Sequence, residues 1–260
     1  MDYNFFNSQT MKILVCISSV PDTTTKISFS NNNTEFNKEG VQYVINPNDE
    51  FGLTKALQLK EKIPGSSVIV IHIGGSSSDP VIRKSLAIGA DEAVRVDINP
   101  NDSIQVAKEI ANYLSSNPVD LIITGKESID YNGAILPHAL GELLKIASVS
   151  PCIGLEINGR DATITGIVDG GKEVLTATLP IVIGAQKGLV EENELRIPNM
   201  RGIMQARTKP LSVIPPSENN DLTQSTVSYD TPSQKASCKL IDAGNVEELV
   251  TLLQKEAKVL

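Results

Sequence analysis

Residues 125–133, GKESIDYNG, form the stretch whose composition and position point most directly to ligand chemistry. An apolar, β-branched run at residues 121–124 precedes this stretch and is typical of a buried strand. Apolar residues at helical spacing follow it between Ile135 and Leu144. A strand, a glycine-containing loop and a helix together direct backbone N–H groups at an anion, so the pattern favours phosphate binding. The same pattern is typical of an ordinary connection in an α/β sheet, and both interpretations stay open.

Side chains capable of covalent or acid–base catalysis are few. Cys16 lies in an apolar run and is expected in the core, while Cys152 and Cys238 have no histidine that the pattern pairs with them. The three cysteines have no metal-ligand spacing, and two histidines are too few for a His-rich metal site. Glu127 and Asp130 resemble an acid–base couple, but a loop-capping role is favoured because no substrate pocket can be argued. We therefore expect no autonomous catalysis.

The elements that would position the loop alternate between strand and helix patterns. Strands are predicted at residues 12–17, 67–73, 93–96 and 121–124, each followed by a helical pattern. This alternation predicts an α/β fold with a doubly wound, mostly parallel sheet. Ligands in such sheets bind at the carboxyl ends of the strands, here residues 18–22, 74–78 and 125–133, with residues 46–49 nearby. Neither a GxGxxG nor a Walker-type loop is present, so the argument for nucleotide binding depends on topology.

Helix boundaries follow from capping and stop signals. Asn48 or Asp49 is expected to cap the first helix, which ends near Lys62 before Pro64 and Gly65. The helix after the 125–133 loop is expected to begin near Asn132 and to bury one stripe of apolar residues. That stripe comprises Ile135, Leu136, Ala139, Leu140, Leu143 and Leu144.

After Pro151 the pattern changes to short strands joined by tight turns. Strands are predicted at residues 153–157, 162–168 and 173–178, with glycine-bearing turns at residues 158–161 and 169–172. A further apolar run at residues 179–184 is expected to return to the main sheet. These features predict a small antiparallel addition to the parallel sheet.

The chain divides into three parts. Residues 1–10 form an N-terminal extension, residues 11–214 an α/β domain that includes the charged 185–200 segment, and residues 215–260 a C-terminal arm. Residues 215–239 are too poor in apolar side chains to fold alone, and an amphipathic helix is predicted at residues 245–260. Such an arm either embraces a partner or packs its helix back on its own domain.

Composition limits the partners. A formal charge of −8, 4% aromatic residues and no tryptophan argue against nucleic-acid binding. No apolar run is long enough to span a bilayer, so no membrane insertion is expected. The first ten residues lack the features of a signal or transit peptide, and Met11 directly precedes the first strand, so a cytoplasmic protein is expected.

Several stretches in sequence order resemble one known family. They are LVCISSVPD at residues 14–22, INPNDE at 45–50, SLAIGAD at 85–91, LIITGKESID at 121–130 and RGIMQARTKPL at 201–211. The strongest match is residues 164–184, where Asp169, Gly170, Gly171, Glu173 and Pro180 fit the family pattern. Together these stretches resemble the β subunit of electron transfer flavoprotein from Met11 to the C-terminus.

The resemblance implies a fold, a partner and a nucleotide. The fold would be like that of adenine-nucleotide α-hydrolases, and the partner a larger α subunit that carries the redox-active FAD. The β subunit itself would hold AMP or, in bifurcating members, a second FAD. Carried over by motif, the pocket residues are Cys16, Ser18, Asn46, Pro47, Asn48, Asp49, Ile73, Gly74, Gly125, Ser128, Ile129, Asp130, Asn132, Gly133 and Ala134.

The chain departs from the family pattern within the same loop. Ile135 and Pro137 stand where the family keeps glutamine and glycine, and Gly133 stands where threonine or cysteine is common. With those side-chain donors absent, backbone amides are left to hold phosphate. This difference favours AMP over a second flavin.

The resemblance also implies surfaces for partners. Leu189, in the charged segment after Ala185, is the candidate apolar anchor for flavin dehydrogenases, and a solvated loop with one incidental leucine is the alternative. The arm and its terminal helix would wrap the α subunit. The implied function is that of a small subunit passing electrons from flavin dehydrogenases to a quinone- or ferredoxin-linked partner. A nucleotide-sensing protein of the universal-stress type is the alternative function, because fold alone does not choose between them.

Overall fold

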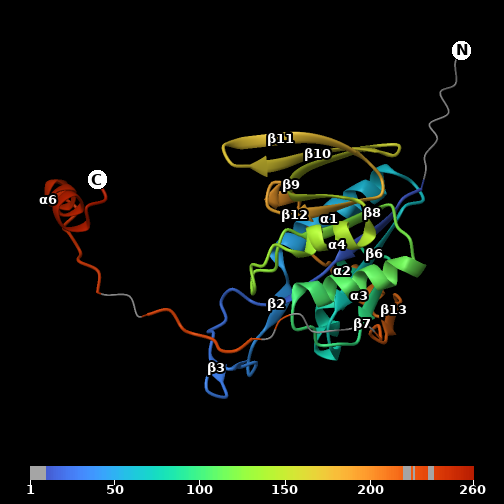
Figure 1. Cartoon of the computed structure of the whole chain (residues 1–260), viewed down its shortest axis with the longest axis horizontal. Helices are drawn as coiled ribbons and strands as arrows, with labels where there is room; N and C mark the ends of the chain where they lie inside the picture. Colours follow the sequence, from blue (N-terminus) through green and yellow to red (C-terminus); the bar gives the residue numbers. More distant parts are fainter. Residues whose placement is uncertain (1–9, 219–223, 225, 234–236) are drawn as a thin grey trace, which may run out of the picture.

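The computed structural model describes residues 10–218, 224, 226–233 and 237–260. All but the last residue of the predicted extension, residues 1–10, therefore lie outside the described residues. One nine-stranded sheet forms the centre of the molecule, in the order β11-β10-β9-β12-β8-β1-β6-β7-β13 (Figure 1). The strands from β9 to β13 in this order all run parallel, while β10 and β11 are antiparallel to their neighbours. The predicted doubly wound, mostly parallel sheet is confirmed.

The central strands are those that the apolar runs predicted. They are β1 (Lys12–Cys16), β6 (Ser67–Ile73), β7 (Glu92–Val96), β8 (Leu121–Gly125) and β12 (Ile181–Ala185). The edge strand β13 (Leu211–Ile214) was not predicted. Val15 of β1 pairs with Val70 of β6 on one side and with Ile123 of β8 on the other. Side chains on both faces of β1, β6, β8 and β12 are buried, as is expected when helices cover both faces of a parallel sheet.

Helices cover the two faces of the sheet. Apolar residues of α1 (Pro47–Lys62), α2 (Asp79–Ile88) and α5 (Met200–Ala206) join one buried cluster, and those of α3 (Ser103–Ser116) and α4 (Leu136–Leu144) join the other. Leu53 and Leu86 are completely buried in the first cluster, and Leu140 is completely buried in the second. The two clusters hold the strand ends in fixed positions.

Two predicted helix starts are wrong. The first helix begins at Pro47 with Asn46 as its N-cap, rather than with Asn48 or Asp49 as the cap, because proline is favoured in the first turn. The helix after the 125–133 loop begins at Leu136, not near Asn132. The predicted buried stripe of this helix is also wrong in part, since Leu143 is exposed and Ile135 precedes the helix.

The antiparallel part extends the main sheet. It is a meander of β9 (Ala147–Asn158), β10 (Asp161–Val168) and β11 (Gly171–Thr178). β9 begins well before the predicted residue 153 and contains Pro151. Register shifts occur beside this proline, between Ile183 and Ala185 in β12 and between Thr165 and Gly166 in β10. Irregular pairing lets a strand accommodate a residue that has no N–H group to donate.

The segment between β1 and α1 forms two small two-stranded sheets. β2 (Ser19–Pro21) pairs with β5 (Tyr43–Ile45), and β3 (Phe29–Ser30) pairs with β4 (Glu35–Phe36). The three asparagines at residues 31–33 form the tip of the second hairpin in left-handed conformations. Short 3₁₀ turns occupy Ser76–Ser78 and Glu192–Glu194.

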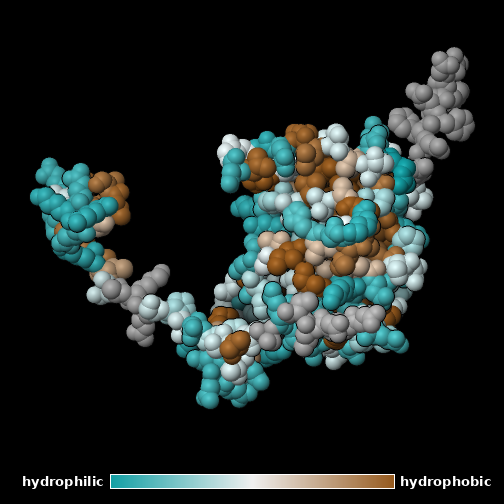
Figure 2. Space-filling view, viewed as in Figure 1, coloured by the Kyte–Doolittle hydropathy of each residue, from teal (hydrophilic) through white to brown (hydrophobic). Residues whose placement is uncertain are grey.

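Beyond β13 the chain leaves the domain as an arm, and α6 (Val246–Leu252) lies away from the sheet (Figure 1). A π-helical turn, Leu253–Ala257, continues α6. Neither element buries any residue, and Val246, Leu249 and Val250 gather apolar surface on one side of the helix (Figure 2). Among the described residues, no helix has both the length and the apolar character needed to cross a bilayer.

Candidate functional site

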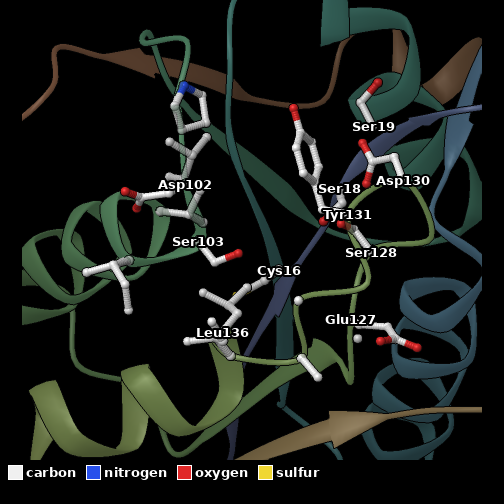
Figure 3. Close-up of a pocket in the computed structure, with 18 of the residues that line it drawn as sticks. Cys16, Ser18, Ser19, Asp102, Ser103, Glu127, Ser128, Asp130, Tyr131 and Leu136 are labelled. Atoms are coloured by element: carbon white, nitrogen blue, oxygen red, sulfur yellow. The ribbon is translucent and has the colours of Figure 1, made fainter. Parts of the chain in front are cut away.

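A cavity of about 370 Å³ lies at the carboxyl ends of β1, β6 and β8. Figure 3 shows Asp102 and Ser103 of the α3 start on one side of it and Ser18, Ser128 and Tyr131 on the other, with Cys16 and Leu136 between them. The cavity therefore has the location where nucleotides bind in doubly wound sheets. Its volume falls near the lower end of the roughly 300–1,000 Å³ that is typical of small-molecule sites.

Asp49 joins the segments that form one wall of the cavity. Its side chain is almost completely buried, and it accepts hydrogen bonds from the backbone N–H of Ser18 at 2.7 Å and from Asn46 Nδ2 at 2.9 Å. Burial raises the pKa of Asp49 to about 7, and these hydrogen bonds act in the opposite direction.

The side chains of Asn46 and Asn48 hold the 125–133 loop against α1. Asn46 Nδ2 and Asn48 Nδ2 each donate to the carbonyl oxygen of Glu127 at 3.0 Å, and the backbone N–H of Ile129 donates to Asn46 Oδ1 at 3.2 Å. Buried amide groups that are paired in this way fix a loop in one conformation. These residues therefore shape the cavity from behind its surface.

Backbone conformation in the loop is tightly constrained. A Cβ atom on Gly125 would lie 2.3 Å from Asp49 Oδ1 and 2.9 Å from Asn46 Nδ2, so only glycine fits there without movement. Asn132 and Ala134 have φ values of +50° and +51°. A left-handed alanine is strained, and residues of this kind cluster at ligand-binding sites.

The electrostatic character of the cavity comes from acidic and neutral groups. Asp49, Asp102, Glu127 and Asp130 line it, and none of its described lining residues is lysine or arginine. A phosphate group would therefore be held by hydroxyl groups, backbone N–H groups and the starts of α3 and α4, which reach the cavity at Ser103 and Leu136. This set of donors fits a nucleotide phosphate.

His72 contributes a neutral acceptor to the cavity wall. Its Nδ1 lies 2.7 Å from the carbonyl oxygen of Ile17, which can only accept, so Nδ1 carries the proton and Nε2 is the acceptor. Burial lowers the pKa of His72, so the imidazole is neutral at pH 7.

Comparison with known proteins identifies the family. A model described as "Electron transfer flavoprotein domain" matches residues 34–219. The chain is 33% identical over 263 residues to "Electron transfer flavoprotein subunit beta" of Bacillus subtilis (strain 168), covering 96% of this chain and 100% of that protein. This chain belongs to the electron transfer flavoprotein β-subunit family.

Two further relatives show the range of this family. The human "Electron transfer flavoprotein subunit beta" is 28% identical over 257 residues, covering 96% of this chain and 99% of the human protein. A protein of Acetobacterium woodii named "Caffeyl-CoA reductase-Etf complex subunit CarD" is 30% identical over 207 residues, covering 78% of each chain.

The cavity brings together a large part of the residues carried over from the electron transfer flavoprotein β-subunit motifs. Nine of the fifteen line it: Cys16, Ser18, Asp49, Ile73, Gly125, Ser128, Asp130, Gly133 and Ala134. The other six do not line it: Asn46, Pro47, Asn48, Gly74, Ile129 and Asn132. Of these six, Asn46, Asn48 and Ile129 take part in the hydrogen bonds that hold the loop.

Sequence reasoning missed several lining residues. They are Ile17, His72, residues 100–104, Val106, Ile135, Leu136, Gln224 and Thr226. The lining residues Ser19, Glu127 and Tyr131 lie in the strand-end loops where a ligand was expected. A signal existed for the start of α3, because Asp102 follows the strand β7 and is a typical N-cap; its Oδ1 accepts from Gln105 N at 2.7 Å. No periodicity or motif marked Gln224 and Thr226.

The expected docking residue is not on the surface. Leu189 is 5% exposed and belongs to the larger core cluster, so this placement does not support its use as an anchor for dehydrogenases. Apolar side chains farther along the chain are exposed instead: Ile197 is 84%, Met200 75% and Met204 68% exposed.

No group of three or more histidine, cysteine, aspartate or glutamate side chains in the described part of the chain is arranged to bind a metal ion.

Proposed function

We propose that this chain is the small subunit of a heterodimeric electron carrier. Its larger α subunit would hold most of the contacts to a redox-active FAD, which supplies the electron-accepting and electron-donating chemistry. The heterodimer would accept electrons from flavin dehydrogenases and pass them to a quinone- or ferredoxin-linked partner. The residues of this chain would bind and orient nucleotides rather than make or break bonds.

The observation that carries the proposal is the cavity itself, in a member of the electron transfer flavoprotein family. The cavity lies at the strand ends, is about 370 Å³ in volume and is shaped by the hydrogen bonds of Asp49 with Ser18 and Asn46. FAD contains an AMP moiety together with a flavin, a ribityl chain and a second phosphate. A cavity near the small end of the usual range therefore favours AMP over a second FAD.

The exposed apolar side chains near α5 support a revised docking surface. We define this surface by Ile197, Met200 and Met204, which lie on the carboxyl side of the charged 185–196 segment. Methionine and isoleucine side chains that are individually this exposed suit the apolar core of a transient protein interface with a polar rim. Flavin dehydrogenases are the partners we assign to it.

The heterodimer and its reduction can be tested together. A tagged β chain co-expressed with the α subunit encoded beside it is expected to purify as a yellow heterodimer. Adding a flavin dehydrogenase and its substrate is then expected to bleach the flavin absorbance. A β chain that purifies alone, colourless and with bound adenine nucleotide would instead favour the nucleotide-sensing alternative.

A further inference from the structure

We propose that Gln224 and Thr226 of the C-terminal arm form part of the wall of the nucleotide cavity, so that nucleotide binding and the position of the arm are coupled. This inference depends on the proposed nucleotide function. The arm residues concerned are Ser217, Gln224, Thr226 and Tyr229, which contact the domain at three separate places.

The first contact fixes the arm to α3. Glu109 is 2% exposed, and its carboxylate accepts from the backbone N–H of Ser217 at 3.2 Å and 3.0 Å and from Ser217 Oγ at 2.8 Å. A carboxylate that is buried without hydrogen-bond donors is strongly unfavourable. The hydrogen bonds from Ser217 therefore stabilise the arm in this position against α3.

The second contact is at the cavity. The backbone N–H of Gln224 donates to Asp102 Oδ2 at 3.0 Å, while Oδ1 of the same carboxylate caps α3. Gln224 and Thr226 both line the cavity. The arm therefore approaches the ligand space at the start of α3, opposite the wall that Asp49 organises.

The third contact lies on the far side of the cavity mouth. The ring of Tyr229 stacks on Phe29 with centroids 4.6 Å apart and an interplanar angle of 7°. Its backbone N–H donates to the carbonyl oxygen of Asn33 at 2.7 Å. Its side chain is close enough to Tyr131, which lines the cavity, to help raise the pKa of that phenol. Contacts of Ser217 and Tyr229 thus hold the arm before and after the two residues that line the cavity, Gln224 and Thr226.

Coupling follows from this geometry. A nucleotide that contacts Gln224 and Thr226 binds more tightly when the arm is in place, and by linkage it holds the arm in place. The same arm continues to α6, whose apolar side is exposed. Occupancy of the cavity therefore determines how the segment that leads to α6 leaves the domain.

The test uses the complete heterodimer and radiolabelled AMP. The double variant Gln224→Ala/Thr226→Ala removes both lining side chains and is expected to raise the Kd for AMP about tenfold. Val227→Ala is the matched control, because Val227 lies on the same stretch but is 82% exposed and does not line the cavity. Hydrogen exchange of the wild-type heterodimer provides a second readout: AMP is expected to slow exchange at the amides of Gln224 and Tyr229.

The outcomes separate the two proposals. Equal AMP affinity in wild type and the double variant, with no change in exchange at these amides, would overturn the role of the arm alone. A wild-type heterodimer that contains FAD but binds no AMP would overturn the nucleotide assignment and this inference with it. An equal loss of affinity in the Val227→Ala control would also overturn the inference, since contact with the cavity would then not be the cause.

Discussion

Replacing Asp49 by asparagine tests the hydrogen-bonded wall of the cavity. Burial raises the pKa of Asp49 from 3.8 to about 7. The folded protein therefore keeps this proton at pH values where the unfolded chain has lost it, and stability falls as the pH rises from about 4 to about 7. The shift in pKa corresponds to a decrease on the order of 4 kcal/mol in the free energy of unfolding as the pH rises through this range.

Asparagine keeps the shape of the side chain but removes the titration. Its NH₂ group would face the N–H of Ser18 or the Nδ2 of Asn46, and a buried donor facing another donor costs about 1–3 kcal/mol. We expect Asp49→Asn to be less stable than wild type by this amount at pH 5. At pH 8 the wild type bears a buried charge, so the difference is expected to shrink or to reverse sign.

The assay is urea unfolding followed by circular dichroism at both pH values, with wild type and variant compared at each. Titration of other groups, including His72, cancels in the difference between the two proteins. Asp22→Asn is the control: hydrogen bonds from Thr24 lower the pKa of this exposed carboxylate, so its effect should be the same at pH 5 and pH 8. A stability difference for Asp49→Asn that is unchanged or larger at pH 8 would refute the reasoning.

Four further substitutions test the loop and the docking surface. Gly125→Ala is expected to cost about 1–3 kcal/mol and to lower nucleotide content, whereas Gly171→Ala, where a Cβ meets nothing within 4 Å, should have little effect in the same unfolding and nucleotide assays. Ala134→Gly relieves a left-handed conformation and is expected to raise stability by up to about 1 kcal/mol in urea unfolding; a loss of stability would argue against strain. Leu189→Ala is expected to cost about 2–5 kcal/mol of stability as a core truncation. Ile197→Ala should leave stability unchanged and slow flavin reduction by the dehydrogenase. If Leu189→Ala instead slows flavin reduction without loss of stability, and Ile197→Ala does not slow it, Leu189 would be the anchor.

The parallel core could be predicted because its strands are buried on both faces. Continuous β-branched runs such as residues 67–73 and 121–124 give a clear signal when helices cover both sides. The start of β9 could not be predicted in this way. Pro151 resembles a strand boundary, but irregular pairing with β10 and β12 accommodates it, and that pairing involves residues distant in sequence.

The candidate site could be predicted only in part, for a similar reason. Residues directly after predicted strands, such as Ser18 and Ser128, line the cavity because the topology brings strand ends together. Gln224 and Thr226 reach the cavity through contacts made by Ser217 and Tyr229. A polar, proline-containing arm has no periodicity that specifies such a course. The prediction that Leu189 is exposed was wrong, because an isolated leucine in a charged segment gives no indication of burial.

The nucleotide content of the purified heterodimer tests the central claim most directly. The complex would be denatured, and the nucleotides released would be separated by chromatography and quantified against protein. One FAD and one AMP per heterodimer is the result that we predict, because the cavity of about 370 Å³ suits a mononucleotide. Two FAD molecules and no AMP would contradict the assignment of the cavity, and a preparation without flavin would contradict the electron-carrier function itself.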